Sequence, residues 1–233
     1  MKIEYLYPEL GNLFGDSANV KYLRACLPEA EIVMTKLGDR PAFADGADLT
    51  YCGAMTERGQ ERALKELRPW REALAESVEA GGRFLMTGNS FELLGEVIEG
   101  GAEPLEGLGI LPLRAKTDLA HRKNSLILAR ADGVTLTAFT SRFSCAWPGE
   151  GLEPFAELVR GIGINPDANF EGVRKNNFIG TYMLGPVLAL NPGWTRVLLR
   201  AMGSEAEPAF LEAAEKAYET RLKEFEDTRR KLD

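Results

Sequence analysis

The sequence predicts an α/β fold with three layers: a mainly parallel sheet, helices on both of its faces, and an antiparallel extension. Two observations support this prediction. Up to residue 98, short apolar runs alternate with segments in which apolar residues recur at helical spacing, as in βαβ units. Beyond residue 100 the pattern changes to Gly-rich turns and β-leaning segments typical of hairpins. No long linker separates these parts, so we expect a single domain over 1–233.

The first half is expected to form regular strand and helix pairs. Asp16 or Ser17 should cap the first helix, because a side-chain oxygen there can accept a hydrogen bond from a free backbone N–H group. Pro69 should restart a helix at its first turn. Gly88-Asn89-Ser90 forms a sharp strand-to-helix turn, which we call the elbow. The expected strands are 2–7, 31–37, 49–52 and 83–87, and the expected helices are 17–27, 57–67, 69–80 and 90–98.

The second half is expected to extend the same sheet with antiparallel strands. After Gly-rich turns around 100–109, strands are expected at 109–117, 124–130, 134–140 and 177–183. Asn191-Pro192 should begin a helix over 193–202. The tail, 205–231, is predicted to be a charged helix that lies on the body of the protein or on a partner. Its apolar face carries Phe210, Leu211, Ala214, Tyr218, Leu222 and Phe225.

Composition excludes several classes of function. A net charge of -7 argues against a nucleic-acid binder, since phosphate binding depends on clustered Lys and Arg. Cys26, Cys52 and Cys145 have no CxxC spacing and fit reduced thiols in a cytoplasmic protein. No segment is apolar enough for a membrane span. A single histidine, His121, cannot build a His-rich metal site, and we expect neither a metal nor a cofactor.

Seven segments, in this order and spacing, carry a resemblance to a known family. They are Leu6-Tyr7-Pro8-Glu9-Leu10, Asn12-Leu13-Phe14-Gly15-Asp16 with Asn19, Gly53–Gln60, Glu92-Leu93-Leu94-Gly95, Gly107–Leu111, Glu171-Gly172 and Ile179–Pro186. The chain resembles class I glutamine amidotransferase domains of the cobyric acid synthase type. Among these it is similar to the glutaminase subunits of lipid II isoglutaminyl synthase, which work in peptidoglycan synthesis beside a Mur-ligase-like subunit. The resemblance implies the same fold and a synthetase partner.

The resemblance also locates the catalytic positions of the family, which need a cysteine nucleophile and a histidine. The cysteine position falls on Gly88 and the histidine position on Leu184. Asn89 and Ser90 stand where the family has glycines, and the loop after the third strand, which helps to form the family's oxyanion site, keeps only Gly53. A further family segment with acidic and histidine residues here reads Phe139-Thr140-Ser141-Arg142-Phe143. The differences between this sequence and the family pattern therefore concentrate at the expected pocket.

Other residues could supply a nucleophile or a ligand-binding group from a different position in the chain. Cys52, at the carboxyl end of a predicted strand, is the best alternative nucleophile, although a small buried hydrophobe is its ordinary role. Ser90 has no base assigned to it. Arg122 and His121 in a basic turn could hold a carboxylate or phosphate, or could be solvated surface.

Of the remaining candidates, Asp16 and Ser17 fit helix caps better than phosphate ligands, and Cys26 and Cys145 fit packing roles.

Three functions follow from these observations. The first is a glutaminase-like pseudoenzyme that has lost glutamine hydrolysis and acts through a Mur-ligase-like or other amide-forming synthetase. The second is an active amidotransferase or hydrolase with a rearranged site that uses Cys52. The third is a sensor that binds a small molecule in the vacated pocket. The aromatic face of the tail helix is our expected docking surface for a protein partner.

Overall fold

The computed structural model describes residues 1–101, 103–229 and 231. Its large sheet has nine strands in the order β2-β1-β3-β4-β13-β12-β11-β8-β9. The first five are parallel to one another. They are β2 (Glu31–Thr35), β1 (Lys2–Leu6), β3 (Leu49–Cys52), β4 (Phe84–Thr87) and β13 (Phe178–Thr181). The predicted parallel sheet is therefore confirmed.

The rest of this sheet is antiparallel. It contains β12 (Phe170–Lys175), β11 (Glu153–Arg160), β8 (Lys123–Ala131) and β9 (Val134–Arg142). β11 and β12 were not predicted from the sequence. The segment 177–183 was expected among the antiparallel strands, whereas β13 pairs in parallel with β4 and so joins the two halves of the sheet.

A second, four-stranded sheet has the order β10-β7-β5-β6. Its strands are β10 (Ser144–Pro148), β7 (Leu113–Thr117), β5 (Val97–Glu99) and β6 (Leu105–Glu106). The expectation that 109–117 extends the main sheet is wrong, because β7 pairs with β5 and β10 in this separate sheet. Residue 102, inside the Gly-rich turn expected at 100–109, lies outside the described residues.

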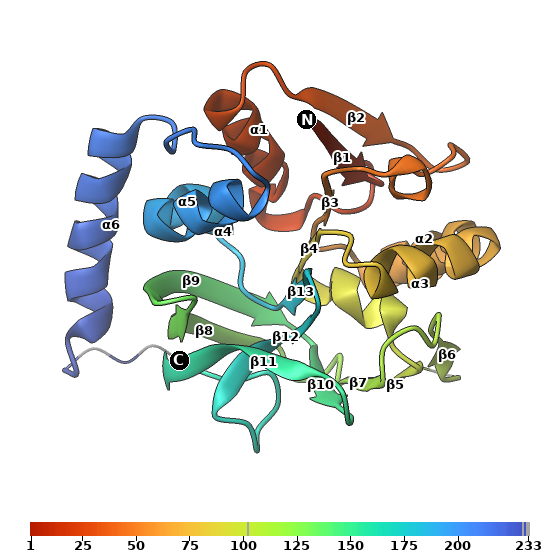
Figure 1. Cartoon of the computed structure of the whole chain (residues 1–233). Coiled ribbons are helices and arrows are strands. Elements are labelled where there is room, and N and C mark those ends of the chain that lie inside the picture. The colour runs from red at the N-terminus through yellow and green to blue at the C-terminus, as the bar shows by residue number, and fades with distance from the viewer. Residues whose placement is uncertain (102, 230, 232–233) are drawn as a thin grey trace.

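Helices cover both faces of the main sheet (Figure 1). One face is covered by α1 (Ser17–Cys26), α4 (Val187–Leu190) and α5 (Pro192–Ala201), and the other by α2 (Glu57–Leu67) and α3 (Arg71–Glu79). Within β4, Leu85 packs on the α1 side, whereas Phe84 and Met86 pack on the α2 side. This alternation is what a strand buried on both faces requires.

The segment after β4 is not the expected α-helix over 90–98. Short 3₁₀ helices occur at Leu13–Gly15, Ala42–Asp45, Arg68–Trp70 and Gly88–Leu94. The last of these ends at Gly95, where a Cβ atom would stand 2.6 Å from the carbonyl oxygen of Leu113. The backbone of Glu96 then donates to the same oxygen. Strand pairing with β7 therefore draws the chain into β5 and stops the helix.

The C-terminal helix α6 (Leu211–Glu226) is shorter than the expected 205–231, and residue 230 of that range lies outside the described residues. The helix contacts β8, β9, α4 and α5. Phe225 is buried, and the hydroxyl of Tyr218 donates to the carbonyl oxygen of Thr135. The expected docking surface is therefore wrong for these two residues, because they pack on the protein's own body. Of the six residues expected on the apolar face, all of which the structure describes, Phe210 alone is exposed, at 77%.

Within the described residues, no helix combines the length and apolar composition that crossing a bilayer requires.

Candidate functional site

A pocket of about 320 Å³ opens at the carboxyl edge of the parallel strands. Its walls come from the segments that follow β3, β4 and β13, which is where open α/β sheets place ligands. The end of β9 and the turn before β8 close the other side. The lining residues are Leu13, Phe14, Ala54, Met55, Thr56, Glu57, Gly88, Asn89, Arg122, Thr140, Ser141, Arg142, Phe143, Ser144, Tyr182 and Leu184.

The elbow has a left-handed backbone conformation at Gly88 and no room for a side chain there. Gly88 has a φ of +64°, a conformation that residues with a Cβ atom rarely adopt. A Cβ atom at this position would stand 2.3 Å from the Cβ and 2.8 Å from the Cα of Ala54. Ala54 therefore occupies the space that a nucleophile on residue 88 would need.

The backbone donors beside the elbow are already used within the protein. The N–H of Ala54 donates to Oδ2 of Asp16 at 2.8 Å, and the N–H of Met55 donates to Oδ1 of Asn89 at 3.0 Å. An oxyanion site depends on donors that point at the place where negative charge develops. These two N–H groups point instead at side chains of the protein.

Asp16 occupies the expected N-cap position of α1, but its carboxylate joins two other segments of the chain instead of capping the helix. Its side chain makes no cap hydrogen bond; Asn12 accepts from the N–H of Ser17 instead. Oδ2 of Asp16 also accepts from Oγ1 of Thr87 at 2.7 Å, so the carboxylate joins the loop after β3 to the end of β4. Burial raises the pKa of Asp16 to about 6, although its hydrogen bonds act in the opposite direction.

The buried carboxylate of Glu92 stabilises the elbow through hydrogen bonds. Glu92 accepts hydrogen bonds from the hydroxyl of Tyr182 at 2.6 Å, from Ser144, and from the side-chain amide of Gln60 at 2.8 Å. The same amide donates to the carbonyl oxygen of Asn89. Burial raises the pKa of Glu92 above its usual value. This network fixes the elbow to β10 and to the segment after β13.

The histidine position of the family is filled by an apolar wall residue. Leu184 is 1% exposed and exchanges two backbone hydrogen bonds with Phe139, at 2.8 and 3.2 Å. The ring of Phe139 in turn meets the ring of Phe14 edge-on, with 5.9 Å between their centroids. This part of the pocket wall has neither a base nor a proton donor in its side chains.

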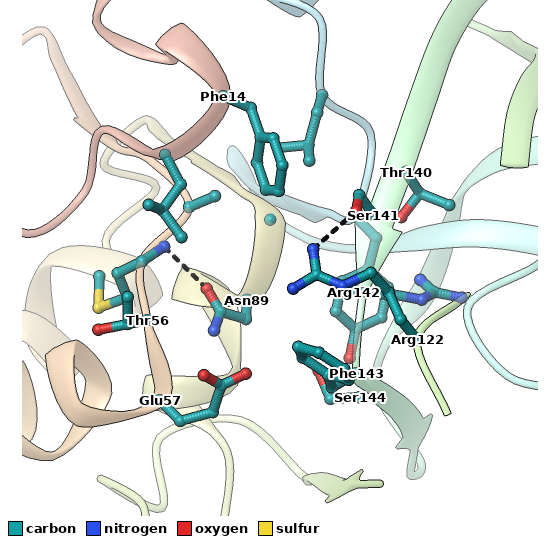
Figure 2. Close-up of a pocket in the computed structure, with 16 residues that line it drawn as sticks. Phe14, Thr56, Glu57, Asn89, Arg122, Thr140, Ser141, Arg142, Phe143 and Ser144 are labelled. Carbon is teal, nitrogen blue, oxygen red and sulfur yellow. Dashed lines mark hydrogen bonds between the residues drawn. The ribbon is translucent and has the colours of Figure 1, made fainter. Parts of the chain in front are cut away.

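The mouth of the pocket is charged. In Figure 2 the guanidinium of Arg122 and the carboxylate of Glu57 point from opposite sides toward the space beside Asn89. Arg122 donates to Oγ of Ser141 at 3.2 Å and lies 4.3 Å above the ring of Phe143. Among the described residues, neither Arg122 nor Glu57 belongs to an ion pair. Both charges are thus available to a ligand.

Of the residues expected from the sequence, Gly88, Asn89, Arg122 and Leu184 meet at this pocket. Cys52 does not reach it: its thiol is fully buried, and burial raises its pKa to about 12.

His121 does not reach it either, because its side chain is 79% exposed and pairs with Asp118 at 2.8 Å. A Cys52–His121 pair across the pocket is therefore absent.

Two further expectations are corrected. Ser90 is completely buried, and its hydroxyl donates to the carbonyl oxygens of Cys52 and Thr87, so it is not placed as a nucleophile. Gly53 packs against Gly11, where a Cβ atom would stand 2.3 Å from the carbonyl oxygen of Gly11. Its close approach to another backbone explains a glycine there without any contact to the pocket.

Glu57 and Arg142 line the pocket without having been singled out from the sequence. Arg142 is 7% exposed and stacks on Tyr182, with 3.8 Å from the guanidinium carbon to the ring centroid. Burial raises the pKa of both Glu92 and Glu171, and the positive charge of Arg142 opposes this rise in part. The sequence pointed to Arg142 only indirectly, because segment 139–143 differs from the family pattern. Nothing in the sequence pointed to Glu57 as a pocket residue beyond its place in the first turn of α2.

Sequence comparison gives two relatives among characterised proteins. Both are GatD subunits of lipid II isoglutaminyl synthase (glutamine-hydrolyzing). The one from Staphylococcus aureus (strain N315) is 26% identical over 193 residues, which cover 81% of this chain and 78% of that protein. The one from Streptococcus pneumoniae (strain ATCC BAA-255 / R6) is 23% identical over 197 residues, or 82% and 76% of the two chains.

Structural comparison agrees on the fold. A crystal structure of a glutamine amidotransferase superposes with a TM-score of 0.56 at 17% identity, and covers 86% of this chain and 98% of its own. A second, from Thermotoga maritima, gives a TM-score of 0.52 at 10% identity, with 94% and 91% covered. Residues 2–192 match the CobB/CobQ-like glutamine amidotransferase domain. The chain therefore belongs to the CobB/CobQ-like glutamine amidotransferase domain family.

Proposed function

We propose that this chain is a glutaminase-like subunit that no longer hydrolyses glutamine and that acts through an amide-forming synthetase of the Mur-ligase type. The two GatD relatives are subunits of a lipid II isoglutaminyl synthase, and this likeness supports a role beside a synthetase in the same kind of chemistry. Three free, buried cysteines fit a place in the reducing cytoplasm.

The main support for the proposed loss of hydrolysis is the close contact between Gly88 and Ala54. Hydrolysis of a carboxamide in this family needs a thiolate that attacks the amide carbon. Gly88 has no side chain, and Ala54 fills the volume in which a cysteine Cβ would lie.

Two further features agree with this proposal. Leu184 cannot accept or deliver a proton, and the N–H groups of Ala54 and Met55 are bonded to Asp16 and Asn89. The nucleophile and the base are thus missing and these two N–H groups are occupied, and such groups act as a unit.

The rival function, an active enzyme that uses Cys52, has little structural support. The thiol is completely buried and does not line the pocket, and burial raises its pKa. A binding role for the pocket is the stronger second candidate. The observation in its favour is that the pocket remains open, and its mouth carries Arg122 and Glu57 with no ion-pair partner within the described residues.

The test is to measure ammonia release from L-glutamine by the purified chain, alone and with a co-expressed Mur-ligase-like synthetase. The S. aureus relative, assayed with its own partner, serves as the positive control. We expect a stable complex with the synthetase and no ammonia above the buffer rate. Ammonia release that disappears in Cys52→Ala would overturn the proposal in favour of the rearranged enzyme. Failure of the two chains to co-purify would remove the partner role.

A further inference from the structure

We propose that a second pocket, beside the one at the elbow, binds a phosphate group that is either free or carried by a small organic ester. This pocket has a volume of about 440 Å³ and lies between the start of β8, the end of β9 and residues 161–168 of the loop that joins β11 to β12. We call it the basic pocket, and the site described above the elbow pocket. The inference goes beyond the proposed function and does not depend on it.

Two cationic side chains are directly opposite each other in the basic pocket. Lys123 begins β8, Arg142 ends β9, and the two residues are register partners in this antiparallel pair. Opposite residues project from the same face of a sheet with their Cβ atoms about 4.5–5.5 Å apart, and like charges at that spacing destabilise the pair. The described residues that line the basic pocket include no Asp or Glu. An anion from solution would therefore relieve this repulsion.

Arg142 has unused hydrogen-bond donors. It is 7% exposed, and its Nη2 donates to the carbonyl oxygen of Gly163 in the wall of the basic pocket. Its Nε and Nη1 have no hydrogen-bond partner among the described residues. In Figure 2 its guanidinium points away from Glu57, whereas that of Arg122 points toward the elbow pocket. Buried N–H groups are normally hydrogen-bonded, so these two indicate an acceptor that comes from outside the chain.

The buried carboxylates near Arg142 are bonded elsewhere. Glu92 accepts from the hydroxyl of Tyr182 at 2.6 Å, and Glu171 accepts from the backbone N–H of Tyr182 at 2.8 Å. Within the described part of the chain, neither carboxylate forms an ion pair with Arg142. Their negative charges act on Arg142 through space and offset its own charge. Arg142 therefore contributes mainly hydrogen-bond donors to a ligand.

Lys123 contributes the positive charge. Its side chain is partly buried and belongs to no ion pair in the part of the chain that the structure describes. The hydrogen bond with His121 holds the pKa of Asp118 below its usual value, and Lys123 adds a smaller effect, so Asp118 already has a partner. Arg122 also borders the basic pocket, but its guanidinium donates to Ser141. The ammonium of Lys123 is thus available to an anion.

A phosphate fits this combination better than a carboxylate. A phosphate monoester carries about −1.5 to −2 charges at pH 7 and has three acceptor oxygens. Separate oxygens can then accept hydrogen bonds from Arg142 on β9 and from Lys123 on β8. A carboxylate has one charge and two oxygens, and satisfies the two side chains less completely.

The basic pocket also has room for the organic part of an ester. A volume of about 440 Å³ lies in the lower half of the range for small-molecule sites. Asn165, 7% exposed, donates to the carbonyl oxygen of Ala146 at 2.8 Å and so holds the loop against β10. A wall that is already in place loses little freedom when a ligand binds. Its apolar lining residues are Leu158, Ile162, Pro166 and Ala168.

The experiment is isothermal titration calorimetry of the full chain, at constant ionic strength, with inorganic phosphate, ribose 5-phosphate and AMP. Ribose and adenosine, which lack the phosphate, and acetate, a carboxylate, are the comparison ligands. We expect one phosphate-bearing ligand per chain and at least tenfold weaker binding of every comparison ligand. If an ester binds more tightly than inorganic phosphate, the source of the phosphate group is an ester. If inorganic phosphate binds at least as tightly, the source is free phosphate.

Variants then assign the contacts. Lys123→Ala should weaken binding of the tightest phosphate probe at least tenfold, and Lys123→Glu should abolish it. Lys116→Ala is the matched control, because Lys116 is exposed on β7 and lines neither pocket. Glu57→Gln distinguishes the two pockets, because Glu57 lines the elbow pocket and not the basic pocket. Both Lys116→Ala and Glu57→Gln should bind phosphate like the unmodified chain.

Arg142→Lys tests the buried donors, because it keeps the positive charge and replaces the guanidinium with a single ammonium. It should bind the phosphate probe at least tenfold more weakly, with an unchanged near-UV circular dichroism spectrum. If this variant does not fold, the two Lys123 variants decide the question, since Lys123 is the first residue of its strand and only partly buried.

Three results would overturn the inference: no binding of any phosphate probe, a comparison ligand that binds as tightly as the phosphate probes, or unchanged binding in Lys123→Ala. Tighter phosphate binding in Glu57→Gln would place the anion in the elbow pocket and overturn it as well. The ammonia and co-purification assays are independent of these measurements. Failure to bind phosphate leaves the proposed function intact, and ammonia release from L-glutamine leaves this inference intact.

Discussion

Ala54 lies so close to Gly88 that a Cβ atom on residue 88 would stand 2.3 Å from the Cβ of Ala54. The two residues follow neighbouring parallel strands, β3 and β4, and meet at the edge of the sheet. The elbow of the family is therefore kept as a backbone shape, with a φ of +64° at Gly88, while a methyl group fills the space next to it.

This contact predicts the effect of restoring a cysteine. Gly88→Cys should lower the free energy of unfolding by about 2–4 kcal/mol, since it adds both an overpacked contact and a side chain at positive φ. Ala54→Gly in the same chain should recover about half of this loss, because it removes the contact with the methyl group but keeps the 2.8 Å approach to the Cα of residue 54 and the positive φ. Urea denaturation of the two single variants and the double variant measures the coupling. A Gly88→Cys variant as stable as the original chain would contradict the packing argument.

Catalysis should not return with the side chains alone. In Gly88→Cys/Ala54→Gly/Leu184→His, a thiol and an imidazole stand at the family positions. The N–H groups of residues 54 and 55 would still bond to Asp16 and Asn89. Loss of one oxyanion donor typically costs a factor of about 10²–10³ in rate. We expect ammonia release from L-glutamine at no more than a trace rate. Full glutaminase activity would show that these donors are not required.

The raised pKa of Asp16 predicts that the free energy of unfolding depends on pH. Burial raises its pKa from 3.8 to about 6 in the folded protein, so the folded state holds this proton more tightly than the unfolded chain. Asp16 therefore favours folding most below about pH 4, and that contribution is lost as the pH rises to about 6. The loss is about 3 kcal/mol, from about two units of pKa.

Asp16→Asn isolates this contribution, because the raised pKa values of Glu92 and Glu171 act in the same direction in both proteins. Between pH 3 and pH 7, the stability of the variant relative to the original chain should rise by about 3 kcal/mol. Denaturant unfolding at four or five pH values provides the measurement. Parallel stability profiles for the two proteins would mean that Asp16 does not titrate in this range.

The three thiols should be unreactive in the folded protein. Cys26, Cys52 and Cys145 are all buried. With a pKa of about 12, Cys52 would carry a thiolate in only about one molecule in ten thousand at pH 8. Dithionitrobenzoate at pH 8 should therefore label none of them until denaturant is added. Rapid labelling of the native chain that is lost in Cys52→Ser would contradict this prediction and support Cys52 as an alternative nucleophile.

Helix α6 should contribute to the stability of the fold. Phe225 is 6% exposed, so Phe225→Ala should cost about 3 kcal/mol. Tyr218→Phe, which removes the hydrogen bond to Thr135, should cost about 1 kcal/mol. Phe210→Ala is the matched control at a residue that is 77% exposed, and should change stability by less than about 0.5 kcal/mol. If Phe225→Ala and Phe210→Ala are equally stable, α6 is not anchored as described.

The sequence by itself determined the layers of the fold and the substituted catalytic positions. The strand at 83–87 could be read because its apolar residues are bounded by Gly81-Gly82 and the Gly88 turn, and these signals are local. Gly88 and Leu184 could be placed because they lie at fixed distances from Glu92-Leu93-Leu94-Gly95 and Gly185-Pro186 in the chain.

Only the tertiary structure decided what surrounds those positions. Ala54 lies 34 residues from Gly88 in the sequence, and Asp16 lies 38 residues from Ala54, yet they meet because β1, β3 and β4 are neighbours in the sheet. The sequence correctly placed Asp16 at the start of α1, but its carboxylate accepts a hydrogen bond from the buried N–H group of Ala54 instead of capping the helix. Contacts of this kind depend on which strands pair and in what register, and the backbone groups left unpaired at strand ends then select the side chains that satisfy them.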